Sequence, residues 1–185
     1  MRTSSRLARP KGLAIVTMGV SGCGKSTLGA LLAARFDCAF LEGDAFHDEE
    51  AVAKMRAGHA LTDEDRWPWL DRLGLAIKET LENEGQVVAA CSALRLRYRE
   101  RLRAAIGASA RFVLLDLGRD ELERRMIQRA GHYMPPSLLD SQLATLERPD
   151  PSEGVFMLDG SLSPEGLCDR VQAWVSTIAP AVLRA

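Results

Sequence analysis

The sequence predicts a three-layer α/β/α domain built on a mostly parallel sheet of five strands with helices on both faces. Short apolar runs alternate with helix-like stretches, which is the pattern of consecutive strand–helix–strand units. A glycine-rich motif also stands between the first apolar run and the first helix, where such sheets bind phosphate groups. The length of 185 residues suits one compact domain with a buried core.

The five expected strands are short and continuously apolar, which is typical of strands buried on both faces of a sheet. They lie at residues 13–18, 39–41, 87–91, 112–115 and 155–158. The expected helices lie at residues 26–36, 67–84, 95–105, 119–130 and 164–178. Residues 1–10 carry arginines but no apolar stretch, so we expect a disordered tail rather than a signal peptide.

The most informative motif is Gly-Val-Ser-Gly-Cys-Gly-Lys-Ser at residues 19–26, a complete phosphate-binding loop. Its backbone N–H groups surround phosphate oxygens, and the helix that follows adds the positive end of its dipole. Lys25 is expected to reach the β- and γ-phosphates, Ser26 to bind Mg²⁺ and Thr27 to contact the α-phosphate. The expected nucleotide contacts of this loop are Gly19, Val20, Ser21, Gly22, Cys23, Gly24, Lys25, Ser26 and Thr27.

Two segments interrupt the alternation of strands and helices. Residues 43–84 are longer than one crossover helix requires, and residues 129–150 separate the fourth strand and its helix from the last strand. Insertions at the strand ends of an open α/β sheet are where ligands bind. We therefore expect 43–84 to bind the acceptor and 129–150 to form a lid that excludes water, within a single domain spanning 1–185.

Two acids follow the second strand, whose end is expected beside the phosphate-binding loop. Asp44 is favoured as the base that orients and deprotonates an attacking hydroxyl, and Glu42 as the residue on the metal side. The alternative, that both are solvated loop acids, stays open. The third strand carries no aspartate for the metal, which favours a small-molecule kinase over a GTPase or a helicase-type ATPase.

Several arginines are candidates for binding anions. Arg66 offers a forked donor for a carboxylate, although it also fits the start of a helix. Arg95 and Arg99 lie four residues apart on one helical face, near the end of the third strand. Arg125 and Arg129 share the same spacing just before the expected lid, where they could act like a built-in arginine finger. The alternative for each pair is a solvated helix face.

Composition excludes several classes of function. The formal net charge is −1, so nothing favours nucleic acid as a partner. The sequence has no apolar run of the roughly eighteen residues that a membrane span needs. The four cysteines form no C-x-x-C pair, which indicates free thiols in a reducing cytoplasm rather than a zinc site or disulfides.

A combination of motifs across residues 13–159 is more specific than the phosphate-binding loop alone. Besides that loop it comprises Gly43-Asp44, His47, Lys54-Met55, Asp63-Glu-Asp-Arg66, Pro68-Trp-Leu70, Cys91-Ser-Ala-Leu94, His132-Tyr-Met134 and Ser141-Gln142. Together these motifs resemble those of the bacterial-type gluconokinases, small P-loop kinases related to shikimate and adenylate kinases.

The resemblance implies ATP-dependent phosphorylation of D-gluconate at its 6-hydroxyl, giving 6-phosphogluconate and ADP. It also implies Mg²⁺, a cytoplasmic setting and a homodimer. The gluconate contacts that it implies are Asp44, His47, Arg66, Arg99 and, in the lid, His132. Similarity to adenylate kinases further implies that Arg125 stacks on adenine while Arg129 meets phosphate.

Besides a polynucleotide end kinase, against which the near-neutral net charge argues, two other functions remain open from the sequence. One is a kinase of another small hydroxy acid, of the shikimate type, and residues 44–70 argue against it because their composition is gluconokinase-like. The other is a nucleotide-binding regulatory module without turnover, and the presence of Lys25, Asp44 and Arg129 argues against that reading.

Overall fold

Five parallel strands form the centre of the computed structural model, which describes residues 12–128 and 136–182. The strands are β1 (Leu13–Met18), β2 (Ala39–Glu42), β3 (Gln86–Ala90), β4 (Ala110–Asp116) and β5 (Phe156–Asp159). Their order across the sheet is β2-β3-β1-β4-β5, and every neighbouring pair is parallel. The predicted α/β fold is confirmed. The expected tail at 1–10 lies outside the described residues.

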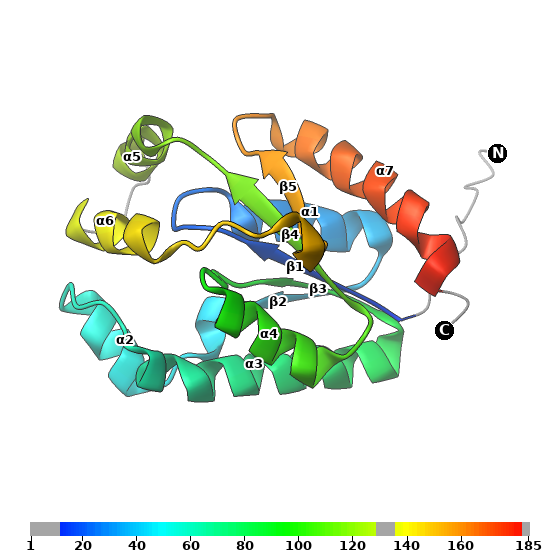
Figure 1. Ribbon diagram of the computed structural model, residues 1–185, viewed down its shortest axis with the longest axis horizontal. Coiled ribbons are helices and arrows are strands. Elements are labelled where there is room, and N and C mark those ends of the chain that lie inside the picture. Colours follow the sequence, from blue (N-terminus) through cyan, green and yellow to red (C-terminus); the bar gives the residue numbers. More distant parts are fainter. Residues whose placement is uncertain (1–11, 129–135, 183–185) are drawn as a thin grey trace.

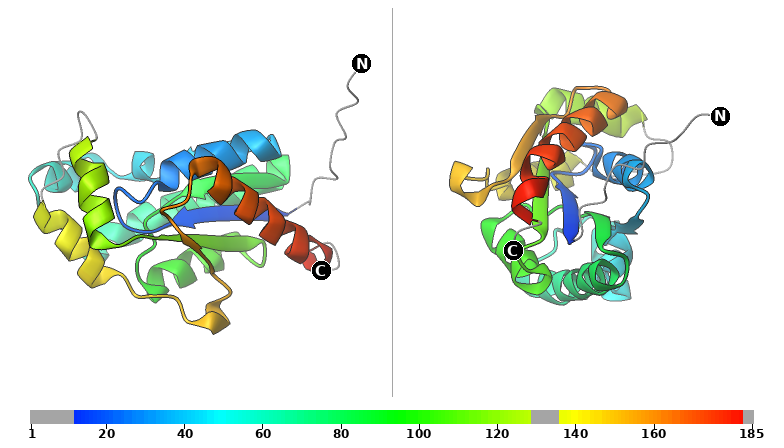
Figure 2. Two further views of the ribbon diagram at one scale, coloured as in Figure 1. Left: turned by 90° about the horizontal axis from the view of Figure 1, so that it is seen from above. Right: turned by 90° about the vertical axis from the view of Figure 1, so that its right-hand side faces the viewer.

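Helices cover both faces of the sheet (Figures 1 and 2). They are α1 (Lys25–Phe36), α2 (Glu49–Arg56), α3 (Asp63–Glu84), α4 (Leu96–Ile106), α5 (Arg119–Gln128), α6 (Pro136–Thr145) and α7 (Pro164–Val182). Two 3-10 turns, η1 (Gly43–Phe46) and η2 (Pro151–Glu153), complete the described elements. Helices α1 and α7 pack on one face and α3 and α4 on the other, while α2, α5 and α6 gather at one end of the sheet (Figure 1).

Strand β1 shows why the core has two halves. All six of its residues are buried, and successive side chains of a strand point to opposite faces. Leu13 and Ile15 join the cluster under α1 and α7. Ala14, Val16 and Met18 join the cluster under α3 and α4. The continuous apolar run therefore supplies both halves of the core, as expected for a strand covered on both faces.

The long helix α3 begins earlier than the sequence pattern indicates. A start near residue 67 is expected from Pro68, but the helix begins at Asp63. The Thr62 hydroxyl accepts the Asp65 N–H while the Asp65 carboxylate accepts the Thr62 N–H. This reciprocal cap satisfies helix donors that are otherwise unpaired. It therefore decides the start of α3, and Pro68 lies inside the helix.

Helices α2 and α6 lie within the two interrupting segments, and neither of these two helices is predicted from the sequence. Across residues 12–128 and 136–182, no helix is long and apolar enough to cross a membrane.

Candidate active site

The phosphate-binding loop joins the end of β1 to the start of α1. Gly24 precedes the helix with a φ of 101°, a left-handed conformation that favours glycine. Gly19 has a φ of 135°, and a Cβ there would lie 2.9 Å from the Cys23 sulfur. The Thr17 hydroxyl donates to the Lys25 carbonyl at 3.0 Å. Glycine is therefore required at two points of this tight turn, and β1 holds the turn against the sheet.

The start of α1 is suited to an anion. No side chain among the described residues caps it, and its first turn contains no acid. By contrast, Asp48 caps α2 and Thr62 caps α3. The N–H groups that open α1 thus keep their capacity to bind an anion, and the helix dipole favours negative charge there.

Lys25 lies over the loop to which it belongs. Its Nζ donates to the Val20 carbonyl at 3.1 Å. The neighbouring Ser26 and Thr27 stand in the first turn of α1, which places two hydroxyl groups beside the open N–H groups. The predicted residues of the phosphate-binding loop are thus arranged around one concave turn.

A cavity of about 340 Å³ adjoins the outer side of this loop. It is lined by Gly22, Cys23, Gly24, Thr27, Leu28, Arg125, Gln128, Leu162, Pro164 and Leu167. The Arg125 guanidinium donates to the Gly160 carbonyl at 2.9 Å and to the Cys23 carbonyl at 3.4 Å. The Glu121 carboxylate, 2.7 Å from Nε of Arg125, orients the same group. The cavity has the apolar walls and fixed cation that suit a nucleoside next to bound phosphates.

The acceptor side of the site begins at the turn η1, directly after β2. The Trp69 indole N–H donates to the Gly43 carbonyl at 2.7 Å. A Cβ on Gly43 would lie only 2.1 Å from the Ala90 carbonyl oxygen, so the turn can approach β3 only because this residue is glycine. Asp44 follows and is exposed. The sequence therefore places an exposed carboxylate at the edge of the sheet on a rigid turn.

His47 packs beside this turn against Trp69. Their rings stack with centroids 4.2 Å apart and planes inclined by 14°. Burial lowers the pKa of His47, the nearby Arg66 lowers it further, and Asp44 acts in the opposite direction. Its Nδ1 is buried and has no hydrogen-bond partner among the described residues. The structure therefore holds a neutral imidazole with one unpaired nitrogen beside the turn.

Cys91 follows β3 and is affected by three of the predicted residues. Burial raises the pKa of its thiol to about 12. Asp44 also raises this pKa, whereas Lys25 and Arg66 lower it. The loop lysine, the candidate base and the candidate carboxylate-binding arginine thus each have an electrostatic effect on the residue that follows β3.

A second cavity, of about 240 Å³, lies between α3, α4 and α6. Its lining is Leu61, Thr62, Asp63, Glu64, Arg66, Arg95, Tyr98, Ser141 and Thr145. Nε of Arg66 donates to the Leu61 carbonyl at 3.3 Å, and the guanidinium lies 5.5 Å from the centre of the Tyr98 ring. The Leu61 carbonyl thus binds only the Nε edge of the Arg66 guanidinium. The cavity has the size that a small acid needs.

Ser141 and Thr145 have no assigned role in the sequence analysis, where they stand in the expected lid. The family resemblance includes motifs in this part of the chain, among them Ser141-Gln142. The i, i+4 spacing of the two hydroxyl residues is a helical signal, but it does not by itself indicate a ligand.

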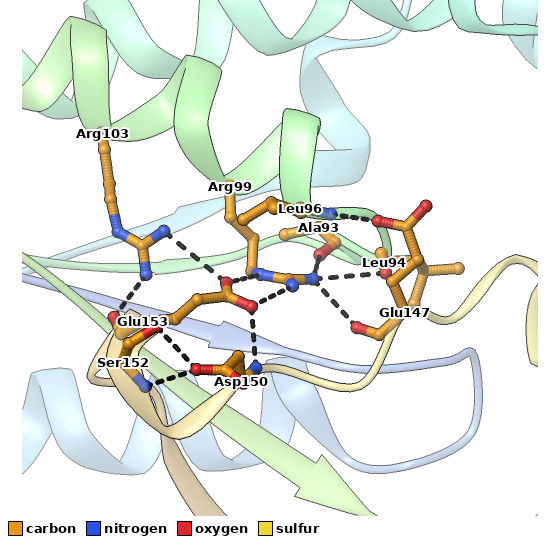
Figure 3. Close-up of polar contacts among 9 residues, drawn as sticks. All are labelled: Ala93, Leu94, Leu96, Arg99, Arg103, Glu147, Asp150, Ser152 and Glu153. Atoms are coloured by element: carbon orange, nitrogen blue, oxygen red, sulfur yellow. Dashed lines mark hydrogen bonds and ion pairs between the residues drawn. The ribbon is translucent and has the colours of Figure 1, made fainter.

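Arg99 differs from its expected role as a gluconate contact. Its side chain is 0% exposed and forms a bidentate ion pair with Glu153, at 2.7 and 2.9 Å (Figure 3). Its remaining contacts are the carbonyls of Ala93, Leu94 and Glu147, at 3.2–3.3 Å. Arg99 thus joins α4 to the segment that leads into β5. Arg95, four residues earlier, lines the cavity of about 240 Å³, whereas Arg99 faces the interior.

The buried pair predicts a clear stability effect. Glu153→Gln is expected to lower the free energy of unfolding by about 3 kcal/mol, because Arg99 keeps its charge without a buried counter-ion. Arg99 holds the pKa of Glu153 below its usual range, so in the native protein this stabilisation is present above the ordinary glutamate pKa and is lost as pH falls. Urea unfolding followed by circular dichroism measures both effects.

A matched control stands on the same helix. Arg101 pairs with Asp71 at 2.6 Å, and the two side chains are 42% and 55% exposed. Asp71→Asn should therefore cost less than about 1 kcal/mol. Equal losses for Glu153→Gln and Asp71→Asn would contradict the special role of the buried pair.

The remaining predicted site residues are less well defined by the structure. Arg129 and His132 lie outside the described residues. Glu42 ends β2 opposite Ala90 in the sheet and is partly exposed. In the described part of the chain, no three or more His, Cys, Asp or Glu side chains gather into a metal-binding group.

Comparison with known proteins identifies the family. A sequence profile described as an AAA domain matches residues 15–149. The gluconokinase of Gluconobacter oxydans (strain 621H) is 44% identical over 151 residues, which cover 82% of this chain and 84% of that protein. The chain belongs to the gluconokinase family. A solved structure of a gluconokinase from Sinorhizobium meliloti 1021 has a TM-score of 0.84 at 39% identity and covers 95% of this chain and 98% of that one.

The fold of the gluconokinase family extends to other small kinases. The shikimate kinase of Bacteroides thetaiotaomicron has a TM-score of 0.65 at 17% identity, covering 89% of this chain and 98% of that one. At this identity the likeness concerns the fold alone. The predicted relation to shikimate kinases is confirmed at that level, and it carries no information on the acceptor.

Proposed function

We infer that this chain is a gluconokinase, which transfers the γ-phosphoryl group of ATP to the 6-hydroxyl of D-gluconate and releases 6-phosphogluconate and ADP. The observation that carries the proposal is the arrangement of three charges: Lys25 lies over the phosphate-binding loop, Asp44 is exposed on the turn after β2, and Arg66 lines the cavity of about 240 Å³. Lys25 binds the phosphates, Asp44 accepts the hydroxyl proton, and Arg66 binds the carboxylate of the acceptor.

The transfer requires positioning and charge more than strong bases. The hydroxyl oxygen of gluconate forms a bond to the γ-phosphorus while the bond to the bridging oxygen of ADP breaks. The hydroxyl proton passes to Asp44 as the new bond forms. Lys25 and the N-terminus of α1 hold the β- and γ-phosphates, so negative charge that develops on ADP stays next to fixed donors.

Magnesium fits the residues present. Ser26 in the first turn of α1 and Glu42 at the end of β2 supply hard oxygen ligands. Magnesium is commonly held by one or two protein oxygens together with phosphates and water. When bound, Mg²⁺ neutralises charge on the β- and γ-phosphate oxygens.

The acceptor is assigned to the region around η1 and the start of α3. Arg66 lines the cavity of about 240 Å³ and offers its guanidinium to the gluconate carboxylate. The unpaired Nδ1 of His47 is suited to a gluconate hydroxyl, since burial keeps the imidazole neutral. These features support 43–84 as the acceptor-binding segment.

The segment 129–150 is proposed as the lid, supported by α6, which lines the acceptor cavity with Ser141 and Thr145 and contacts the phosphate-binding loop through Gln142. The roles proposed for Arg129 and His132 lie in the part of this segment outside the described residues. The cytoplasmic setting and the homodimer stay predictions.

A coupled ADP-release assay tests the acceptor. Gluconate should give the highest kcat/KM in a panel with other aldonates and shikimate. A preference for shikimate, or ADP release that does not depend on any acceptor, would replace the proposed reaction.

Arg66→Lys sharpens the same assay. Lysine lacks the planar fork that matches a carboxylate, so the KM for gluconate should rise about tenfold while the KM for ATP stays unchanged. Arg101→Lys, at an exposed pair on α4, is the matched control and should change neither value. A higher KM for ATP with an unchanged KM for gluconate would move Arg66 to the nucleotide side.

A further inference from the structure

Gln142 reaches the phosphate-binding loop from α6. Its Oε1 accepts the backbone N–H of Ser21 at 2.7 Å, across 121 residues of sequence. A backbone N–H can only donate, so this contact sets the orientation of the side-chain amide. Oε1 faces Ser21, and the amide NH₂ group, which has two hydrogens to donate, points elsewhere. A neutral donor is therefore held beside the loop.

The chain neighbours of Ser21 and Gln142 line the two cavities of the site. Gly22, Gly24 and Thr27 turn toward the cavity assigned to the nucleoside. The neighbour of Gln142 in α6, Ser141, lines the cavity assigned to the acceptor. The Ser21–Gln142 contact therefore stands at the acceptor end of the loop, where the terminal phosphate of ATP must lie for transfer.

Packing holds α6 in this position. Leu139 is 1% exposed within the core, and Leu143 and Leu146 pack against the same cluster. The chain that follows is tied to the start of α4, since the Glu147 N–H donates to the Leu94 carbonyl at 2.8 Å and the Glu147 carboxylate accepts the Leu96 N–H at 2.7 Å. The place of Gln142 is thus set by a core-anchored helix and not by a freely moving side chain.

We propose that Gln142 binds the terminal phosphoryl group of ATP. Its NH₂ group donates to a γ-phosphate oxygen while Oε1 stays on the Ser21 N–H. ADP lacks this phosphate and cannot make the contact. Through Gln142 the site therefore distinguishes ATP from ADP. Helix α6 contacts the nucleotide only when the γ-phosphate is present. The inference rests on the proposed kinase function.

Isothermal titration calorimetry on the full chain, without acceptor, tests the contact. The ligands are ADP and a non-hydrolysable ATP analogue. Gln142→Ala should weaken binding of the analogue about tenfold and leave ADP binding unchanged. Gln142→Glu keeps the size of the side chain but cannot donate and repels phosphate, so it should weaken the analogue further. Gln172→Ala removes the amide that accepts a hydrogen bond from Arg35, remote from the site, and should change neither affinity.

The outcomes separate this inference from the proposed function. Three results for Gln142→Ala would overturn the role of Gln142: an equal loss of affinity for the ATP analogue and for ADP, an unchanged ratio of these two affinities, or tighter binding of the analogue. The last result would mean that Gln142 only covers the loop. Failure of the native protein to bind either nucleotide would overturn the kinase function as well. Thermal melting without nucleotide identifies any variant that is not folded, and Gln142→Glu then supplies the test.

Discussion

Lys25→Ala is expected to lower kcat on the order of 10³-fold, the scale for removing one donor to developing charge, while the protein stays folded. The only hydrogen bond of Nζ with the described residues is to the Val20 carbonyl at 3.1 Å, so the side chain contributes little to packing. Its charge is instead held over a loop whose helix start is open to phosphate. The loss should therefore appear in turnover and nucleotide binding, measured by ADP release and calorimetry.

Lys78→Ala is the matched control for this change. Lys78 is 51% exposed on α3 and lies 4.0 Å from Glu82, so its removal should affect neither turnover nor stability. Near-native turnover in a folded Lys25→Ala protein would remove the loop from catalysis. If Lys25→Ala lowered the melting temperature as well as turnover, the loss of activity would come from a damaged fold and not from the missing charge.

Asp44→Asn should lower kcat on the order of 10²-fold or more, the scale for a general base, with ATP binding largely kept. A sugar hydroxyl is a weak nucleophile, and its proton must leave as the bond to phosphorus forms. Asparagine keeps the shape and one acceptor oxygen but cannot take the proton. Because Asp44 is exposed on a turn held by Trp69 and Gly43, the substitution should not disturb the fold.

The measurement is kcat at saturating gluconate, together with calorimetric binding of ATP analogue. Asp169→Asn is the control and should behave like the native protein. The Asp169 carboxylate on α7 is 71% exposed and pairs with Arg35 on α1. A small change in kcat for Asp44→Asn would assign proton removal to water or to another group. A structure with gluconate bound gives independent geometry, because Asp44 should lie within hydrogen-bond reach of the terminal hydroxyl.

Local patterns in the sequence were sufficient for the fold and for the turn that forms the phosphate-binding loop. The glycines of residues 19–24 encode a turn that few other residues can form, and the apolar run of β1 encodes burial on both faces. Both signals act over a few neighbouring residues, so they can be recognised without knowing the rest of the chain. The same holds for Gly43-Asp44, where a tight turn places a carboxylate at a strand end.

The roles of Arg99 and Gln142 could not be obtained in this way. Spacing shows that Arg95 and Arg99 share one side of α4, but the partner of Arg99 is Glu153, which lies 54 residues further along the chain. Gln142 likewise meets Ser21 only because α6 packs on the core beside the loop. In both cases the decisive contact joins segments far apart in sequence, and no local preference of either segment records it.

The sequence by itself therefore determined the parallel α/β sheet, the phosphate-binding loop and the kinase family, because each depends on residue types at short and regular spacing. The tertiary structure alone decided which arginine is buried and which lines a cavity, and which residue of α6 touches the loop. The physical reason is that burial and charge pairing are set by the packing of helices on the sheet. That packing sets the distances between residues, and these distances cannot be obtained from the separation of the residues in the sequence.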